Sequence, residues 1–205
     1  MPHLMKAFNE CLQNGEFPEN WKIEMTVILR KAAKEDYSNP NAYRPIALLN
    51  TLGKLFERII NDRLVHWAER SGAIAQGHMG GQKGHNINNA LVLLTSWMKP
   101  KWQEGKIATR TFLDVESAYP TVHKERLIHT LCSKGAPNSL VVIINSFLSN
   151  RHTKIKLNDF ISDDFSIQQG IPQGSPLSVS LYLIYNSSLL LPNPPNLKED
   201  QLSIA

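Results

Sequence analysis

A single aspartate at the end of an apolar stretch is the side chain of this sequence best suited to hold a metal ion. Asp114 directly follows Phe112 and Leu113, and Tyr119 comes five residues later. A carboxylate at the end of a buried strand reaches a cleft from rigid backbone, which suits a magnesium ligand. An aspartate after a strand is also a common turn or capping residue, so the spacing leaves both interpretations open.

A second candidate site is the decapeptide QGIPQGSPLS at positions 169–178. Gly170 and Gly174 permit positive φ or close approach of a ligand, whereas Pro172 and a second proline stiffen the turn. Gln173 is then held in a fixed place with an amide that both donates and accepts hydrogen bonds. Such a group suits contact with a base or a sugar, although a stiff strand-to-helix connector with a solvated glutamine fits the same residues.

Basic residues gather around a third candidate, Arg44. Because Pro45 restricts the residue before it to extended backbone, Arg44 is a rigid mount for a guanidinium that meets a phosphate. Lys31, Lys34 and Lys54 make the region locally basic. For Lys54, Arg58 and Arg63 we favour the solvated face of a helix, balanced by Glu57 and Asp62, but not for Arg44.

The composition predicts a globular chain of one domain, or of one domain with a small subdomain. Of 205 residues, 42% are hydrophobic and 20% charged, which argues against disorder. No apolar run reaches the ~20 residues of a membrane helix, and the first residues lack the apolar core of a signal peptide. Cys11 and Cys132 lack metal-finger spacing, so we expect an intracellular protein with reduced cysteines. The net charge of +4 is compatible with a polyanionic partner but does not show one.

The candidate residues depend on elements that hydrophobic periodicity predicts. We expect helices over residues 3–14, from Asn50 to Gly72, and over 87–104, 123–133, 138–149 and Pro176 to about Leu191. Alternation predicts a strand from Ile23 to Leu29, a polar loop over 32–45, and a buried strand, IATRTFLDV, ending at Asp114. Two short strands in TKIKLND and FISDDFSIQQG predict a hairpin or meander. The chain is thus expected to be mixed α/β or α+β, with helices around a small sheet.

Two of these helices have a predicted inner face. The long helix after Asn50 carries one wide apolar face, made of Leu52, Leu55, Phe56, Ile59, Ile60, Leu64 and Trp67. The helix over 87–104 places Leu91, Leu94 and Met98 on its inner face. The glycine-rich segment between the two helices, residues 73–86, has no such periodicity and predicts a connection.

Four stretches follow one another along the chain: a basic strand end, YRPIALLNTLGKLFERIINDRL, FLDVESAYPTV and QGIPQGSPLS. Together they resemble the reverse transcriptase domain of non-LTR (LINE-like) retrotransposons. The resemblance covers roughly residues 15–205. It implies an α+β fold, the fingers and partial palm of a right-hand polymerase around a small antiparallel sheet. By the same resemblance, residues 1–20 form a helical lead-in, 21–105 a fingers-like region and 106–205 a partial palm.

The resemblance also implies roles for individual residues. Asp114 matches the catalytic, metal-binding aspartate, and the carbonyl of Val115 would face a second metal ion. Tyr119 matches the aromatic residue that excludes the ribose 2′-hydroxyl. The remaining nucleotide contacts are Gln173 and Gly174 in the decapeptide, and Arg44 and Lys31, which match residues that clamp the triphosphate.

The implied chemistry is Mg²⁺-dependent nucleotidyl transfer by an RNA-directed DNA polymerase. Its partners would be an RNA template, a DNA primer and deoxynucleoside triphosphates, with no membrane. Two ions of Mg²⁺ need several converging carboxylates. The family supplies the others from a Tyr-x-Asp-Asp hairpin that this sequence lacks, and Glu199 and Asp200 are poor substitutes. We therefore expect the chain as given not to polymerise.

The sequence departs from the family pattern at two further places. Proline at position 120 stands where the family commonly has aspartate, and the segment QGHMGGQKGHN receives no role. The phrase Leu202-Ser203-Ile204-Ala205 resembles the strand that leads into Tyr-x-Asp-Asp. Besides a polymerase fragment, the chain is compatible with a non-catalytic nucleic-acid-binding remnant, or with a decayed retroelement fragment of low stability.

Overall fold

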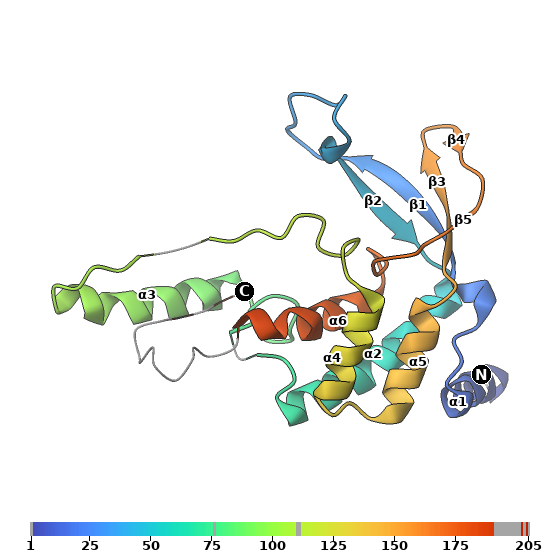
Figure 1. Ribbon diagram of the computed structural model, residues 1–205, viewed down its shortest axis with the longest axis horizontal. Helices are drawn as coiled ribbons and strands as arrows, with labels where there is room; N and C mark the ends of the chain where they lie inside the picture. The colour runs from blue at the N-terminus through green and yellow to red at the C-terminus, as the bar shows by residue number, and fades with distance from the viewer. Residues whose placement is uncertain (1, 76, 110–111, 191–201, 203, 205) are drawn as a thin grey trace.

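Helices α2, α4, α5 and α6 lie together below a small sheet (Figure 1). The computed structural model describes residues 2–75, 77–109, 112–190, 202 and 204. The helices are α1 (Pro2–Asn14), α2 (Thr51–Ser71), α3 (Ile87–Gln103), α4 (Lys124–Ser133), α5 (Asn138–Leu148) and α6 (Pro176–Asn186), with 3-10 turns at Glu19–Trp21, Pro40–Ala42 and Ser187–Leu190. The strands are β1 (Ile23–Arg30), β2 (Tyr43–Leu48), β3 (His152–Leu157), β4 (Phe160–Ile161) and β5 (Phe165–Ser166).

The long helix α2 is the centre of the apolar core. Asn50 begins it by accepting the backbone N–H groups of Leu52 and Gly53, and Gly72 ends it with a φ of 65°. Phe56 is fully buried and packs against Phe8 and Phe17. The buried apolar face of α2 is narrower than predicted, because Leu52 and Leu55, near the start of the helix, are exposed.

The sheet is mixed, which corrects the expectation of an antiparallel one. Its order is β2-β1-β3-β4, with β5 also paired to β3. β1 and β2 are antiparallel, whereas β1 and β3 run parallel with Ile23 opposite His152. The helices α2 to α5 lie between these two strands in the chain, and such a crossover returns the chain in the parallel direction.

Strand β2 was not predicted, because its sequence contains Pro45 and was assigned in part to a polar loop. The structure begins the strand at Tyr43 and pairs Pro45 with Ile28 of β1. A proline is tolerated there because β2 lies at the edge of the sheet. Arg44, before the proline, is extended as expected.

The predicted strand ending at Asp114 is absent from the described residues. The chain from 112 to 115 is irregular, and the side chains of Phe112 and Leu113 are 82% and 90% exposed. Among the described residues, no strand of the sheet pairs with this segment. A β-strand is held by hydrogen bonds to a neighbouring strand, so this segment does not form one. The residues proposed to lead into Tyr-x-Asp-Asp fall partly outside the described residues, at 203 and 205.

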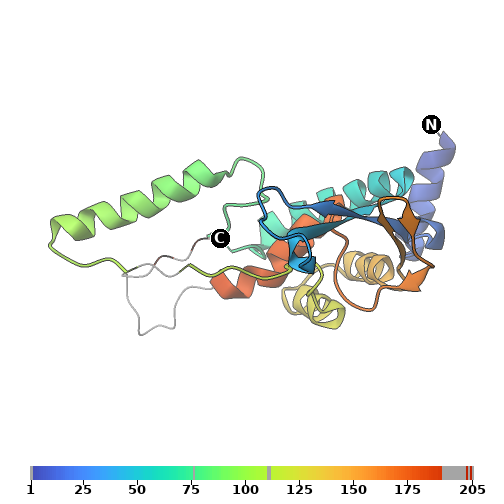
Figure 2. The same ribbon diagram turned by 90° about the horizontal axis from the view of Figure 1, so that it is seen from above.

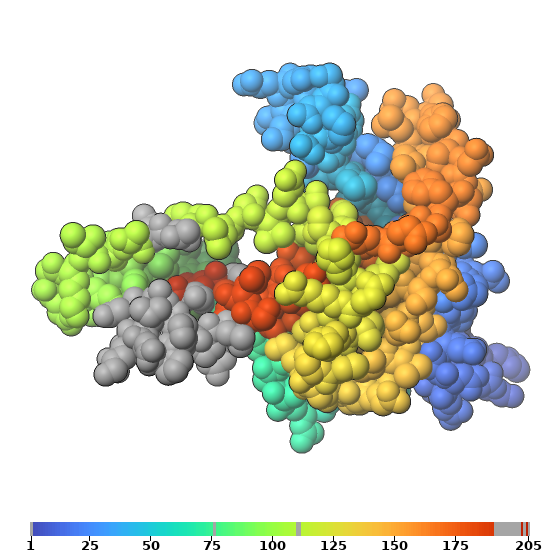
Figure 3. Space-filling model, viewed as in Figure 1, coloured from blue at the N-terminus to red at the C-terminus, as the bar shows by residue number. Residues whose placement is uncertain are grey.

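Helix α3 extends away from the other helices, as Figures 1 and 2 show. Of its predicted inner face, Met98 is buried but Leu91 is 53% exposed. In the space-filling view α3 and the segment after it project from the rest of the molecule (Figure 3). No helix in the described part of the chain is long and apolar enough to cross a membrane. The prediction of a mixed, helix-rich chain is confirmed. The division into a helical lead-in, a fingers-like region and a partial palm stays a prediction.

Candidate functional site

Residues 169–175, which we call the Gln173 loop, are attached on one side to the chain at 119–122. The backbone N–H of Gly170 donates to the carbonyl of Val122 and that of Ile171 to the carbonyl of Tyr119, both at 3.0 Å. Gly170 has a φ of 91°, and a Cβ there would lie 2.8 Å from the carbonyl oxygen of Pro120. Only glycine allows this approach.

On its other side the Gln173 loop is attached to the edge strand β2. The carbonyl of Gln173 accepts the N–H of Ala47 at 2.9 Å. Gly174 has a φ of 126°, and a Cβ there would lie 2.7 Å from the carbonyl oxygen of Ala47. Ser175 then begins helix α6, because its Oγ accepts the N–H of Leu177 at 3.1 Å. The two glycines of the decapeptide are therefore explained by two close backbone contacts.

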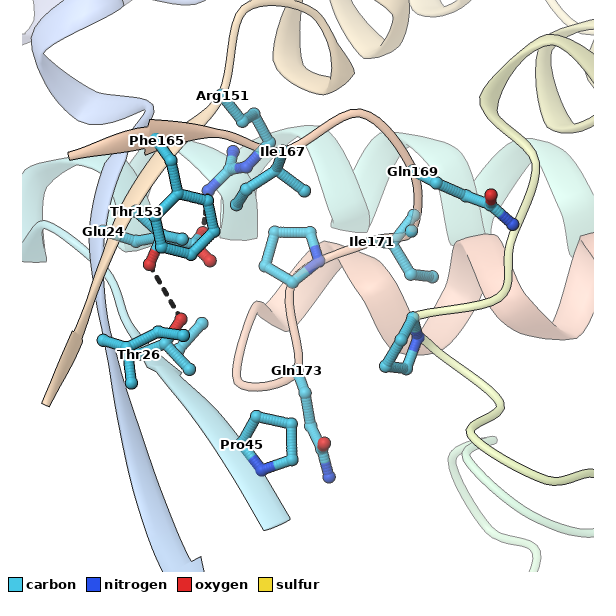
Figure 4. Close-up of a pocket in the computed structure, with 15 residues that line it drawn as sticks. Glu24, Thr26, Pro45, Arg151, Thr153, Phe165, Ile167, Gln169, Ile171 and Gln173 are labelled. Carbon is cyan, nitrogen blue, oxygen red and sulfur yellow. Dashed lines mark hydrogen bonds and ion pairs between the residues drawn. The ribbon is translucent and has the colours of Figure 1, made fainter. Parts of the chain in front are cut away.

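A cavity of about 300 Å³ lies between the sheet and the Gln173 loop (Figure 4). Its walls come from β1, β2, β3, Pro120 and the loop itself. Gln173 lies beside Pro45 in the close-up, with its amide at the end away from the loop backbone. A hydrogen bond of 2.8 Å between the hydroxyls of Thr26 and Thr153 spans the sheet wall. The cavity is mostly apolar, with few polar groups, as is typical of a small-molecule site.

A buried ion pair closes the cavity where β3 begins. Nη2 of Arg151 donates to Oε2 of Glu24 at 2.7 Å, and Nη1 donates to the carbonyl of Phe147 at 3.3 Å. Arg151 is 1% exposed. Removing one partner of such a pair leaves an uncompensated charge, so the pair strongly favours the parallel register of β1 and β3. Sequence analysis missed both residues, because 127 positions separate them.

Glu57 of α2 connects to the Gln173 loop from below. Oγ of Ser175 donates to Oε2 of Glu57, whose side chain is fully buried. Burial raises the pKa of Glu57 to about 7, against the lowering effect of Ser175 and of the nearby Arg151. From the sequence, Glu57 fits the solvated face of the helix, since Lys54 lies three residues before it as a possible ion-pair partner. The sequence signal for this part of the contact was the serine before proline in QGSP, which is typical of the start of a helix.

Tyr119 lies next to this loop, because its carbonyl accepts the N–H of Ile171, while its contact with a nucleotide stays a prediction. Its ring packs against that of Tyr182 of α6 with centroids 5.2 Å apart. Burial, followed by the neighbouring Tyr182, raises the pKa of the Tyr119 phenol above its usual value. Tyr119 is therefore a neutral, half-buried ring beside the loop that carries Gln173 and Gly174.

Asp114 and Val115 differ from expectation, because both lie in the exposed irregular segment. In the part of the chain that the structure describes, no group of three or more His, Cys, Asp or Glu residues is placed to hold a metal ion. One exposed carboxylate does not fit a site for two Mg²⁺ ions. The described residues therefore do not make the metal site that the resemblance implied.

Lys31 and Arg44 lie on the β1–β2 hairpin, away from the cavity. The ammonium of Lys31 donates to the carbonyl of Asn41 at 2.9 Å. Arg44 is exposed on β2 and pairs with Leu29. Because side chains alternate along a strand, and Pro45 and Ala47 line the cavity, Arg44 lies on the opposite face of the sheet. The structure thus brings Tyr119, Gln173 and Gly174 together, but not Lys31 or Arg44 with them.

Residues 30–199 match the family model described as reverse transcriptase (RNA-dependent DNA polymerase). The chain belongs to the reverse transcriptase family. This confirms the predicted resemblance to the reverse transcriptase domain of non-LTR retrotransposons.

Named relatives of this reverse transcriptase chain are encoded by insect mobile elements. It is 28% identical, over 191 residues, to the probable RNA-directed DNA polymerase from transposon BS of Drosophila melanogaster, covering 93% of this chain and 21% of the relative. It is 28% identical to the RNA-directed DNA polymerase from mobile element jockey of the same species, with 91% and 20% covered. A segment of 62 residues is 46% identical to the Pol polyprotein of the type-1 element R1 of Bradysia coprophila, 30% of this chain and 6% of that protein. The chain spans about a fifth of the length of the first two relatives.

Proposed function

We propose that this chain forms the nucleotide-binding side of an RNA-directed DNA polymerase. The observation that carries the proposal is the attachment of the Gln173 loop to β2, to residues 119–122 and to α2, next to a cavity. A loop attached on three sides presents its amide in one place, as selective binding of a nucleotide requires.

In this proposal Gln173 and Gly174 contact the incoming deoxynucleotide and the template, and Tyr119 lies against the sugar and disfavours a 2′-hydroxyl. The packing of Tyr119 on Tyr182 supports a fixed ring position. Arg44 and Lys31 are proposed contacts of the triphosphate. Arg44 lies on the same edge strand as Ala47, whose N–H holds Gln173, so a triphosphate extending along that edge would approach it.

Polymerisation itself is proposed only for a longer protein that supplies further carboxylates. Asp114 and the Val115 carbonyl remain our candidates for a metal site, but the described residues offer no cluster that would complete it. The fingers and partial palm of a right-hand polymerase are, likewise, a proposal that rests on family membership and on the mixed sheet. An RNA template and a DNA primer are the proposed partners.

The direct test is deoxynucleotide affinity in the presence of an RNA template annealed to a DNA primer. Gln173→Ala removes the amide but leaves the backbone contact with Ala47, and we expect affinity to fall about tenfold, or about 1.4 kcal/mol. Gln168→Ala is the matched control, because Gln168 is exposed in the same connection and its amide donates to Ser166. Equal affinities of wild type and Gln173→Ala would contradict the assignment.

A second function, nucleic-acid binding without catalysis, is favoured by the face of the sheet opposite the cavity. Strand alternation places Arg44, Lys154 and Lys156 on this face, and all three are exposed. If the face binds phosphates, the double variant Lys154→Ala, Lys156→Ala should lower the salt dependence of RNA–DNA binding by roughly two phosphate contacts. Lys6→Ala, on the exposed surface of α1, should leave that slope unchanged.

A further inference from the structure

Helices α2 and α6 meet around four buried polar side chains, which we call the α2–α6 polar cluster: Glu57, Asn61, Ser175 and Ser178. Glu57 and Asn61 are four residues apart and so lie on one face of α2. Ser175 and Ser178 are three apart at the start of α6. The hydrogen bond from Ser175 to Glu57 joins the two pairs.

The hydrogen bonds of Ser175 show in which direction that contact runs. Its Oγ already accepts the backbone N–H of Leu177 at 3.1 Å and that of Ser178 at 3.2 Å. A hydroxyl has a single proton to donate, and here it goes to Oε2 of Glu57. Ser175 therefore transmits the position of Glu57 to the residues next to it in the chain, Gly174 and Gln173.

Three oxygen atoms of the cluster have no hydrogen-bond partner among the described residues: Oε1 of Glu57, Oδ1 of Asn61 and Oγ of Ser178. An ionised carboxylate only accepts hydrogen bonds, so it cannot satisfy the oxygen of Asn61 one helical turn away. A proton on Oε1 removes the buried charge and gives that atom a proton to donate, while Oε2 still accepts from Ser175. The neutral form thus fits the cluster better than the ion.

The charged groups around Glu57 do not outweigh its burial. Desolvation is the largest effect on its pKa and raises it, whereas Arg151 before β3 and Lys54 on the same helix lower it. Glu24 of β1 raises it further. At the start of α6, the hydroxyl of Ser175 also lowers it, and the resulting pKa is about 7.

We propose that Glu57 is a positioning residue: as a neutral acid it anchors the Gln173 loop through Ser175, and loss of its proton loosens that loop. An ionised Glu57 leaves a buried charge with one unpaired oxygen. Movement of the loop away from α2 relieves this by admitting water to the carboxylate. The consequence, weaker deoxynucleotide binding above neutral pH, rests on the proposed function of the loop; the anchor itself does not.

Amide hydrogen exchange tests the anchor without a nucleotide. The N–H of Ala47 donates to Gln173, so its protection reports whether the loop is seated on β2. The N–H of Lys31, which donates to Ala42 at the far end of the hairpin, is the internal reference. With a pKa of about 7 when the loop is seated and 4.5 when it is free, the protection of Ala47 relative to Lys31 should fall about tenfold from pH 6 to pH 8.

Three variants separate anchoring from general stability. Glu57→Gln keeps the shape but cannot lose a proton, so the tenfold change with pH should disappear. Ser175→Ala breaks the connection and should give low protection of Ala47 at both pH values. Glu69→Gln, on the exposed face of the same helix, should behave as wild type.

The amide and nucleotide measurements have separate outcomes. A tenfold change that persists in Glu57→Gln, or one that is absent from the wild type, would overturn the anchor. If the amide pattern is as expected while no deoxynucleotide binds at either pH, the anchor is supported and the proposed function is the part that fails. If both hold, nucleotide affinity should weaken with rising pH in the wild type alone and not in Glu57→Gln.

Discussion

The Gln173 loop and the segment around Asp114 differ sharply in how the chain holds them. The loop makes backbone hydrogen bonds to β2 and to residues 119–122, and a side-chain bond to Glu57. The Asp114 segment is irregular and exposed, without a paired strand among the described residues. The Gln173 loop finds hydrogen-bond partners on helix α2 and on the edge strand β2, whereas a β-strand forms only when it pairs with a neighbouring strand. The proposed binding residues are therefore positioned here, and the proposed metal ligand is not.

The largest expected difference between the two regions is in stability. Phe56→Ala removes a fully buried ring at the centre of the core and should lower the free energy of unfolding by about 3–5 kcal/mol. Leu113→Ala, in the exposed segment, should change it by less than about 0.5 kcal/mol. Urea unfolding followed by circular dichroism measures both. Similar losses would mean that the segment around Asp114 is packed in solution.

The next effect concerns pH. Because folding raises the pKa of Glu57 from 4.5 to about 7, its contribution to stability is fully present below pH 4.5 and is lost as the pH rises through 7. Between pH 5 and pH 8 the wild type should therefore lose about 2.5 kcal/mol more than Glu57→Gln does. Urea unfolding of both proteins at the two pH values gives the comparison. Parallel pH profiles would show that Glu57 titrates normally.

A smaller effect tests the close approach of the loop to β2. Gly174→Ala places a Cβ 2.7 Å from the Ala47 carbonyl at a φ of 126° and should destabilise the protein by about 2 kcal/mol. Gly84→Ala also has positive φ but meets nothing within 4 Å, so it measures the backbone strain alone. The excess loss in Gly174→Ala is the cost of displacing the loop from β2. Equal thermal midpoints would place the loop away from β2.

The smallest effect is expected at Asp114. Because the described residues place Asp114 in no group of three or more possible metal ligands, Asp114→Asn should leave the unfolding midpoint within about 1 °C of the wild type, with and without millimolar Mg²⁺. The purified chain should likewise not extend a DNA primer on an RNA template. A rise in midpoint with Mg²⁺ that Asp114→Asn abolishes would show that Asp114 binds the ion and would contradict this prediction. Template-dependent extension of the primer would contradict it as well.

The helices and β1 could be predicted because their signals are local. Helix α2 begins at a capping asparagine and ends at a glycine, and its hydrogen bonds join residues four apart. The sequence of strand β1 places apolar residues at alternate positions, from Ile23 to Leu29, which is the local pattern of a strand. The same reasoning failed for IATRTFLDV, which is not one of the strands of the sheet in the described part of the chain, and for β2, where Pro45 obscured an edge strand.

The family, the order of the helices and the stiffness of QGIPQGSPLS can be predicted from residue types at short separations. Three contacts cannot: the pairing of Arg151 with Glu24, the hydrogen bond between Ser175 and Glu57, and the parallel pairing of β3 with β1. Those contacts join residues more than a hundred positions apart, and burial makes their charges matter. The pKa of Glu57 follows from such burial, because the energy of a carboxylate depends on the atoms that replace water around it, wherever in the chain they come from.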